Sequence, residues 1–118
     1  MAEYTPEEQL EMIEISSEQA KEKVELRDAV AALLKNKHFK KVFSDYYLKK
    51  YPVRLISLKA SVSMQDEQHQ KFIGNQLNAI GHLDQFLSYV EQEGNASERL
   101  INQNQEEMDL IRAEAGVA

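Results

Sequence analysis

Residues 65–93 read QDEQHQKFIGNQLNAIGHLDQFLSYVEQE and carry the longest regular apolar pattern of the chain. Ile73, Ile80 and Leu87 recur every seven residues, and further apolar residues follow them at three- and four-residue spacing. Such spacing places apolar side chains on one face of an α-helix. The stretch therefore predicts a long amphipathic helix and, with it, an all-α protein.

A small residue follows each of these three apolar positions. The two glycines among them should cost the helix about 1 kcal/mol each relative to alanine, so packing is expected to compensate. Small residues let another backbone approach closely, and that backbone belongs either to this chain or to a second copy. The candidate packing or oligomer seam comprises Ile73, Gly74, Ile80, Gly81, Leu87 and Ser88.

Gly94 is expected to end this helix, because glycine is the usual residue just past a helix C-terminus. Asn95 and Glu98 can cap the start of another helix over about 96–115, whose apolar residues include Ile101 and Met108. Two helices joined by so short a turn form an antiparallel pair. We therefore predict a helical hairpin over 65–115.

Residues 1–30 are predicted to form an acidic helical arm at the N-terminus. Thr5 can be the N-cap, Pro6 suits the first helical position, and Glu8 can close a capping box. The apolar stripe continues to Leu34 with a polar break at 16–17. We expect either one helix over about 6–35 or two pieces that meet at this break.

Residues 32–60 carry eight Lys/Arg against one acid, Asp45, whereas residues 1–31 sum to −6 and residues 61–118 to −7. This segregation predicts a surface with two oppositely charged regions. The basic stretch is the best place for an acidic partner to bind. The candidate partner-binding residues are Lys37, Lys40, Lys41, Lys49, Lys50 and Arg54.

Five of the nine aromatic residues fall in the same stretch. After a predicted helix break at Asn36, the spacing of one helix face is followed by Phe39, Val42, Phe43, Tyr46 and Tyr47. We expect these rings to face the core and the lysines to form the outer surface. Exposed rings would instead suit stacking on nucleic-acid bases. Protein is the preferred partner, either the chain's own acidic helices or a neighbouring subunit.

Pro52 is expected to end this helix, because a proline inside a helix removes a donor and clashes with the preceding turn. Residues 53–60 then form either a short second helix opened by the proline, which we prefer, or an extended piece. Residues 31–61 are thus predicted to be basic, aromatic helices.

The sequence contains no recognisable catalytic or metal-binding motif. There is no cysteine, and none of His38, His69 and His82 lies four residues from another. Asp66-x-x-His69 resembles half of a di-iron element, but Ala79 occupies the position of the second acid. We expect no enzymatic activity, no metal and no cofactor.

Composition predicts a single helical domain over 1–118, a small bundle with an N-terminal arm and a C-terminal hairpin. The chain is 42% apolar and 29% charged, and it holds only four Gly and two Pro. No apolar run approaches the roughly 18 residues of a membrane span. The acidic, polar N-terminus is not that of a secretory signal.

Three segments carry a resemblance to a known group of proteins: LLKNKHFKKVF at 33–43, RLISLKA at 54–60 and QLNAIGHL at 76–83. With the acidic C-terminal tail, they are similar to small helical proteins encoded among the structural genes of tailed bacteriophages. The resemblance covers about residues 30–115, is a pattern of apolar and basic positions, and transfers no functional residues. It implies a virion or head-assembly component, found in the host cytoplasm during infection and in the virion.

We therefore expect a non-enzymatic phage structural or assembly protein that contacts copies of itself or other virion proteins through its helices. The alternative is a small regulatory binding module that uses the basic stretch 35–59 on nucleic acid or on an acidic host protein. The two differ in whether the protein forms an oligomer whose mass is insensitive to DNA.

Overall fold

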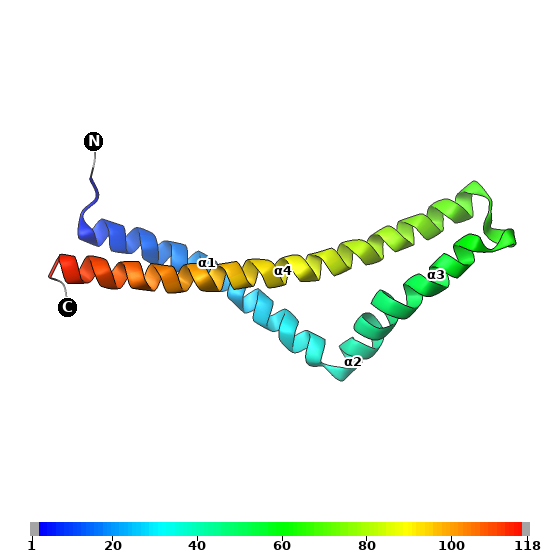
Figure 1. Ribbon diagram of the computed structural model, residues 1–118, viewed down its shortest axis with the longest axis horizontal. Helices are drawn as coiled ribbons and strands as arrows, with labels where there is room; N and C mark the ends of the chain where they lie inside the picture. The colour runs from blue at the N-terminus through cyan, green and yellow to red at the C-terminus, as the bar shows by residue number, and fades with distance from the viewer. Residues whose placement is uncertain (1–2, 117–118) are drawn as a thin grey trace. The chain divides into compact units, whose positions relative to one another are not determined.

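The computed structural model describes residues 3–116, which form helices and short turns without any strand (Figure 1). The predicted all-α class is confirmed. The elements in chain order are α1 (Pro6–Lys35), α2 (Lys37–Phe39), the π-helix η1 (Lys40–Lys50), α3 (Tyr51–Ala60), the 3₁₀ turn η2 (Val62–Met64) and α4 (Glu67–Glu114).

The helix α4 continues without a break through Gly94, so the predicted hairpin over 65–115 is wrong. Gly94 does not cap a helix; it lies against α1. A Cβ atom at this position would collide with the Cβ, Cγ and Cδ atoms of Arg27. The glycine with positive φ is Gly116, just past the end of α4, where a left-handed residue commonly terminates a helix.

The described residues divide into two compact units, with α1 and α4 contributing to both. Residues 3–29 and 90–116 carry 16 Asp/Glu against five Lys/Arg, a net charge of −11, and we call them the acidic unit. Residues 30–89 carry nine Lys/Arg against four Asp/Glu, a net charge of +5, and we call them the basic unit. The charge segregation of the sequence therefore follows the division into units.

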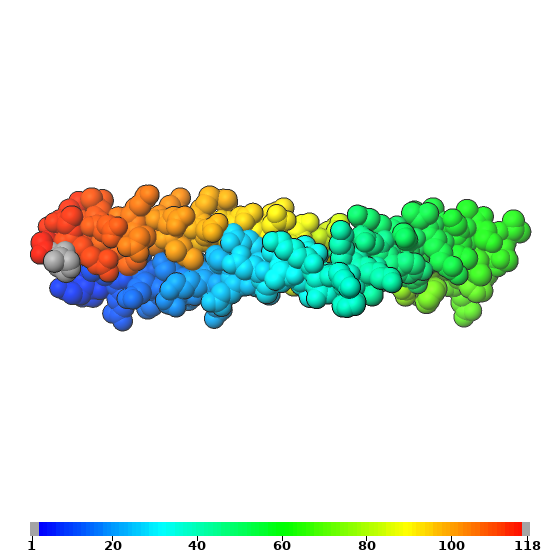
Figure 2. All heavy atoms as spheres, turned by 90° about the horizontal axis from the view of Figure 1, so that it is seen from below, coloured from blue at the N-terminus to red at the C-terminus, as the bar shows by residue number. Residues whose placement is uncertain are grey.

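The acidic unit is an antiparallel pair of helices (Figures 1 and 2). Its inward positions alternate at spacings of three and four residues on both helices, as in a coiled coil. Ser17 and Ser16 contact Asn104, so the polar pair packs in the seam and α1 runs through it as one helix. The one-helix alternative for 6–35 is confirmed. The inward residues are Leu10, Ile13, Ser17, Ala20, Val24 and Arg27 on α1 and Val90, Gly94, Ser97, Ile101, Asn104, Met108 and Ile111 on α4.

The basic unit is held by a small apolar core in which Leu55 of α3 packs with Ile73 and Ile80 of α4. Partly buried residues surround it: Tyr47, Leu48, Tyr51, Leu58, Met64 and Leu77. The turn between α3 and α4 is closed by the Gln70 side chain, which donates to the carbonyls of Lys59 at 2.9 Å and Met64 at 2.8 Å.

Asn36 separates α1 from the helices of the basic unit, as the sequence predicted. Its Oδ1 accepts hydrogen bonds from the backbone N–H groups of His38 at 3.0 Å and Phe39 at 3.1 Å. Its backbone is extended (φ −68°, ψ 126°), which is the geometry of an N-cap. The asparagine therefore ends one helix and starts the next.

Pro52 does not end the helix that precedes it, contrary to the prediction. Residues 37–60 form one helical run, and the preferred helix over 53–60 is confirmed as part of α3. Before the proline the run has π geometry, in which the Tyr51 N–H bonds to the Tyr46 carbonyl five residues earlier. The wider turn relieves the clash between a proline ring and the carbonyl four residues before it.

Candidate protein interaction surfaces

The lysines and arginine predicted to bind a partner all lie exposed on the helical run 37–60. None of these six side chains makes a salt bridge within the basic unit. Their positive charge is therefore not neutralised by neighbouring carboxylates of that unit. The residues are Lys37, Lys40, Lys41, Lys49, Lys50 and Arg54.

The aromatic side chains form a ladder along this run. Phe39 stacks on Phe43 with centroids 4.8 Å apart, and Tyr47 stacks on Tyr51 at 6.0 Å. Tyr47 and Tyr51 pack against the core, as predicted for the whole aromatic set. Tyr46 and Phe43 depart from that prediction, because 48% and 37% of their surfaces are exposed, and Val42, predicted on the same face, is 54% exposed.

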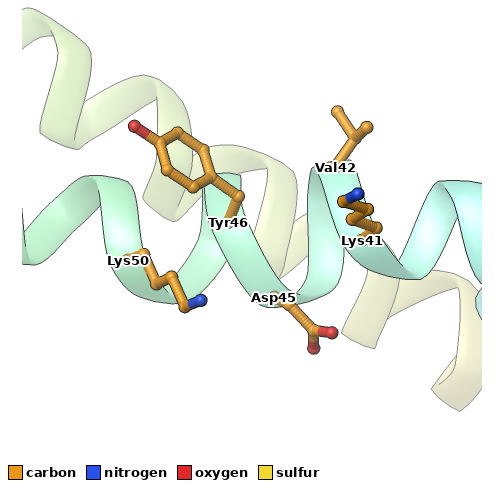
Figure 3. Close-up of a pocket in the computed structure, with 5 residues that line it drawn as sticks. All are labelled: Lys41, Val42, Asp45, Tyr46 and Lys50. Carbon is orange, nitrogen blue, oxygen red and sulfur yellow. The ribbon is translucent and has the colours of Figure 1, made fainter.

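Tyr46 belongs to a shallow depression on η1 that is lined by Lys41, Val42, Asp45, Tyr46 and Lys50 (Figure 3). Val42 and Tyr46 project from the same side of the helix. Because every lining residue comes from one helix, the depression is a feature of an exposed face and not an enclosed ligand cavity. We call Lys41, Val42, Tyr46 and Lys50 the basic face.

On α4 the predicted seam residues divide into two groups. Ile73 and Ile80 are buried in the core, and Leu87 is partly buried. A Cβ atom added at Gly74 or Gly81 would meet no atom within 4 Å, and Ser88 is exposed. Close packing within this chain is therefore wrong as the explanation of the two glycines. A seam between copies stays a prediction.

A second apolar stripe lies on α4 beside the one that packs inward. Phe72 and Phe86 are 57% and 52% exposed, and Tyr89 is exposed to a similar extent. The sequence shows this stripe as the seven-residue spacing of positions 72, 79 and 86. The prediction from sequence followed only the inward stripe of this helix and did not identify an outer one.

The acidic unit also presents apolar residues to solvent. Met12, Ile15 and Leu26 are each about half exposed and lie on α1 opposite its inward positions. Glu11, Glu18 and Glu22 share that side of the helix. We call these six residues the acidic face. The prediction from sequence followed only the inward stripe of α1 and did not include this face.

The inner seam of the acidic unit is unusually polar. Arg27 lies over Gly94 and donates to Asn95 Oδ1 at 2.9 Å and Glu98 Oε2 at 3.1 Å. Hydrogen bonds to Glu98 and then to Asp28 raise the pKa of the Arg27 guanidinium. These contacts fix the register of α1 against α4 at one end of the seam.

The Asp66-x-x-His69 element begins α4. Asp66 Oδ2 accepts from the His69 backbone N–H at 3.2 Å, and its other carboxylate oxygen contacts His69 Nδ1. The side-chain hydrogen bond to His69, and then the backbone one, lower the pKa of Asp66. Over residues 3–116 no group of three or more His, Cys, Asp or Glu side chains gathers as metal ligands would. The pair is thus part of a helix cap.

Comparison with known proteins adds no assignment. No protein-family model matches the chain, and neither does any curated protein or solved structure. Within residues 3–116 the helices are too short or too polar to cross a membrane.

Proposed function

We propose that this protein is a non-enzymatic assembly protein that acts through helix-mediated contacts with other protein subunits. The observation that carries the proposal is the second apolar stripe of α4. Phe72, Phe86 and Tyr89 leave large rings in water beside a stripe that is already packed. An apolar stripe that its own unit does not cover is typical of a helix that packs against another chain.

Burying the exposed rings of the stripe would stabilise an association between subunits. Fully burying an exposed phenylalanine side chain contributes about 1.5–3 kcal/mol, and Phe72 and Phe86, which are a little over half exposed, would each contribute about half of that. Two such residues at one helix face supply a useful part of the free energy of association, although binding also costs translational and rotational freedom.

The setting of this assembly is also a proposal. The resemblance to structural proteins of tailed bacteriophages supports a phage virion or head component, with further copies of the chain or other virion proteins as the subunits contacted. Such a protein would be found in the host cytoplasm during infection and then in the virion.

The mass of the protein in solution tests the proposal. We expect light scattering to give a defined oligomer of the 13.6 kDa chain, with a mass that added DNA does not change. The double variant F72S/F86S should lower that mass. Val62→Ser is a matched control, because Val62 is an exposed apolar residue in the η2 turn and outside the stripe. A wild type that stays monomeric at every concentration would contradict self-assembly.

A second candidate function is nucleic-acid binding by the basic unit. It is favoured by that unit's net charge of +5 and by the exposed Tyr46 ring between Lys41 and Lys50. Lysines on phosphates would give an affinity that falls steeply with salt. A mobility shift of DNA that K40E/K41E abolishes would give this function the lead.

A further inference from the structure

We infer that the basic face of one molecule binds the acidic face of a second copy of this chain. The inference rests on the proposed function, because it names the partner of an assembly protein and the surfaces that meet. The charge, exposure and apolar content of the two faces support this pairing.

The basic face combines two properties that require a partner. Lys41 and Lys50 are exposed and make no salt bridge within their unit. In the same depression, Val42 and Tyr46 expose 54% and 48% of their surfaces (Figure 3). Asp45 is the one acid in the depression, so the face keeps an excess of positive charge. A matching surface must be acidic and apolar at once.

The acidic face of α1 has both properties. Met12, Ile15 and Leu26 expose about half of their surfaces along one side of the helix. Glu11 and Glu22 make no salt bridge with the described residues, and Glu18 pairs only with Lys21 on its own helix. Apolar positions flanked by charges are how helices choose partners of opposite charge.

Nucleic acid fits these observations less well than protein does. A phosphate backbone would pair with the lysines, but it offers nothing for Val42 and leaves the acidic face without a partner. The acidic unit, with a net charge of −11, would also repel it. An acidic helix with its own apolar stripe satisfies the lysines and the apolar side chains together.

A second copy is the partner because each chain carries both faces. The net charges of −11 and +5 lie on separate compact units of the same chain, so every molecule carries both an acidic and a basic face. The two faces differ, which makes each contact heterologous. Such contacts close into a dimer or ring when two or more are made reciprocally, and otherwise extend into a chain of subunits.

Charge reversal with complementation tests the inference on the full chain. K41E/K50E reverses the basic face, and E11K/E22K reverses the acidic face. Sedimentation equilibrium should show self-association weakened by about tenfold or more in each variant alone. An equimolar mixture of the two should recover association, because each supplies the face that the other has lost. Raising the salt concentration should weaken the wild-type contact.

The control is K35E/K71E, which changes the net charge by the same amount at two exposed lysines outside the basic face. It should associate like the wild type, and circular dichroism should show equal helicity in all variants. If K41E/K50E and K35E/K71E behave alike, or if the mixture does not recover association, the inference is wrong.

The remaining outcomes separate this inference from the proposed function. An oligomer whose mass is the same in every charge-reversed variant would overturn the inference but would still support the assembly function. A wild type that is monomeric at all concentrations overturns both. A DNA complex that K41E/K50E abolishes and K35E/K71E preserves would assign the basic face to nucleic acid and overturn the inference alone.

Discussion

Asn104 shows how single polar residues set the register of the acidic unit. It is 6% exposed, and its amide donates to the hydroxyls of Ser17 at 3.0 Å and Ser16 at 3.3 Å. Every buried side-chain polar atom within residues 3–116 has a hydrogen-bond partner. A buried asparagine in a helical seam fixes one register, because sliding the helices would leave its amide unpaired.

Asn104→Ala should therefore lower the free energy of unfolding by about 1–2 kcal/mol, since the buried Ser17 hydroxyl loses its donor. Urea denaturation followed by circular dichroism measures this. Asn102→Ala, at an exposed position of the same helix, should change stability by less than about 0.5 kcal/mol. Equal effects of the two substitutions would show that the Asn104 contacts do not stabilise the seam.

Asp66 gives a prediction that depends on pH. Its pKa is lowered first by the His69 ring and then by the His69 backbone N–H, so the ionised form is favoured in the folded state. Its contribution to stability is present above the pKa of the unfolded chain, about 3.9, and is lost as pH falls through the lower folded value.

Carbon-13 NMR titration of the Asp66 carboxyl should show this depressed pKa in the wild type. In His69→Ala the pKa should rise, yet stay below its usual range, because the backbone hydrogen bond is retained. His82→Ala removes a histidine further along α4 and should leave the titration unchanged. A pKa that does not move in His69→Ala would rule out the ring as the main cause.

Among the elements, α4 shows where sequence patterns were sufficient and where they failed. The three-and-four spacing predicted its helical character and its inward residues correctly. Gly94 followed by Asn95 and Glu98 predicted a cap, because the same residues that end and start helices can also sit inside one. Gly94 instead lies inside the helix, where it allows the close approach of Arg27. Arg27 is 67 residues away in the chain, so local sequence patterns could not predict this contact.

For the helical run 37–60, the predicted helix end at Pro52 was wrong for a different reason. The aromatic spacing predicted its helix, and Asn36 predicted its start. Pro52 was expected to end η1, because the rule against proline assumes the i→i−4 hydrogen bonds of an α-helix. The π geometry of η1 removes that assumption. It also changes which residues share a face, which explains why Tyr46 is exposed while Tyr47 packs inward.

The glycines of α4 provide a matched set of substitutions. Gly74→Ala and Gly81→Ala should each raise the free energy of unfolding by up to about 1 kcal/mol, since alanine favours the helix and no atom obstructs its methyl group. Gly94→Ala should lower it by about 1–3 kcal/mol, because the methyl group forces Arg27 and the α1 backbone away.

Thermal or urea unfolding of the three variants measures the difference. Association must be monitored in parallel, since a methyl group at Gly74 or Gly81 that disrupts the oligomer while leaving helicity intact would reveal the predicted seam between copies. A Gly94→Ala variant as stable as Gly81→Ala would show that α1 does not approach α4 closely at this point.

For the molecule as a whole, the distribution of charge matters more than its total. The net charge is −6, yet the acidic unit alone carries −11. Within α1, Glu7 and Glu11, Glu14 and Glu18, and Glu18 and Glu22 are like-charge pairs four residues apart. Each such pair destabilises a helix by about 0.2–0.5 kcal/mol at low salt. Stability of this unit is therefore limited by its own repulsion.

Salt should accordingly affect folding and association in opposite directions. Raising NaCl from about 20 mM to about 300 mM should raise the melting temperature of dilute, unassociated protein, because screening relieves repulsion along α1. The same change should weaken association through the oppositely charged faces. E11Q/E22Q should melt higher than the wild type at low salt and respond less to added salt.

The control is D45N/D84N, which removes the same number of acids from the basic unit. There the loss of negative charge increases the positive excess, so no rise in melting temperature is expected. If both double variants gain stability equally, total charge rather than its segregation governs the fold. If melting temperature and association both rise with salt, apolar contacts dominate both, and the charged faces do not select the partner.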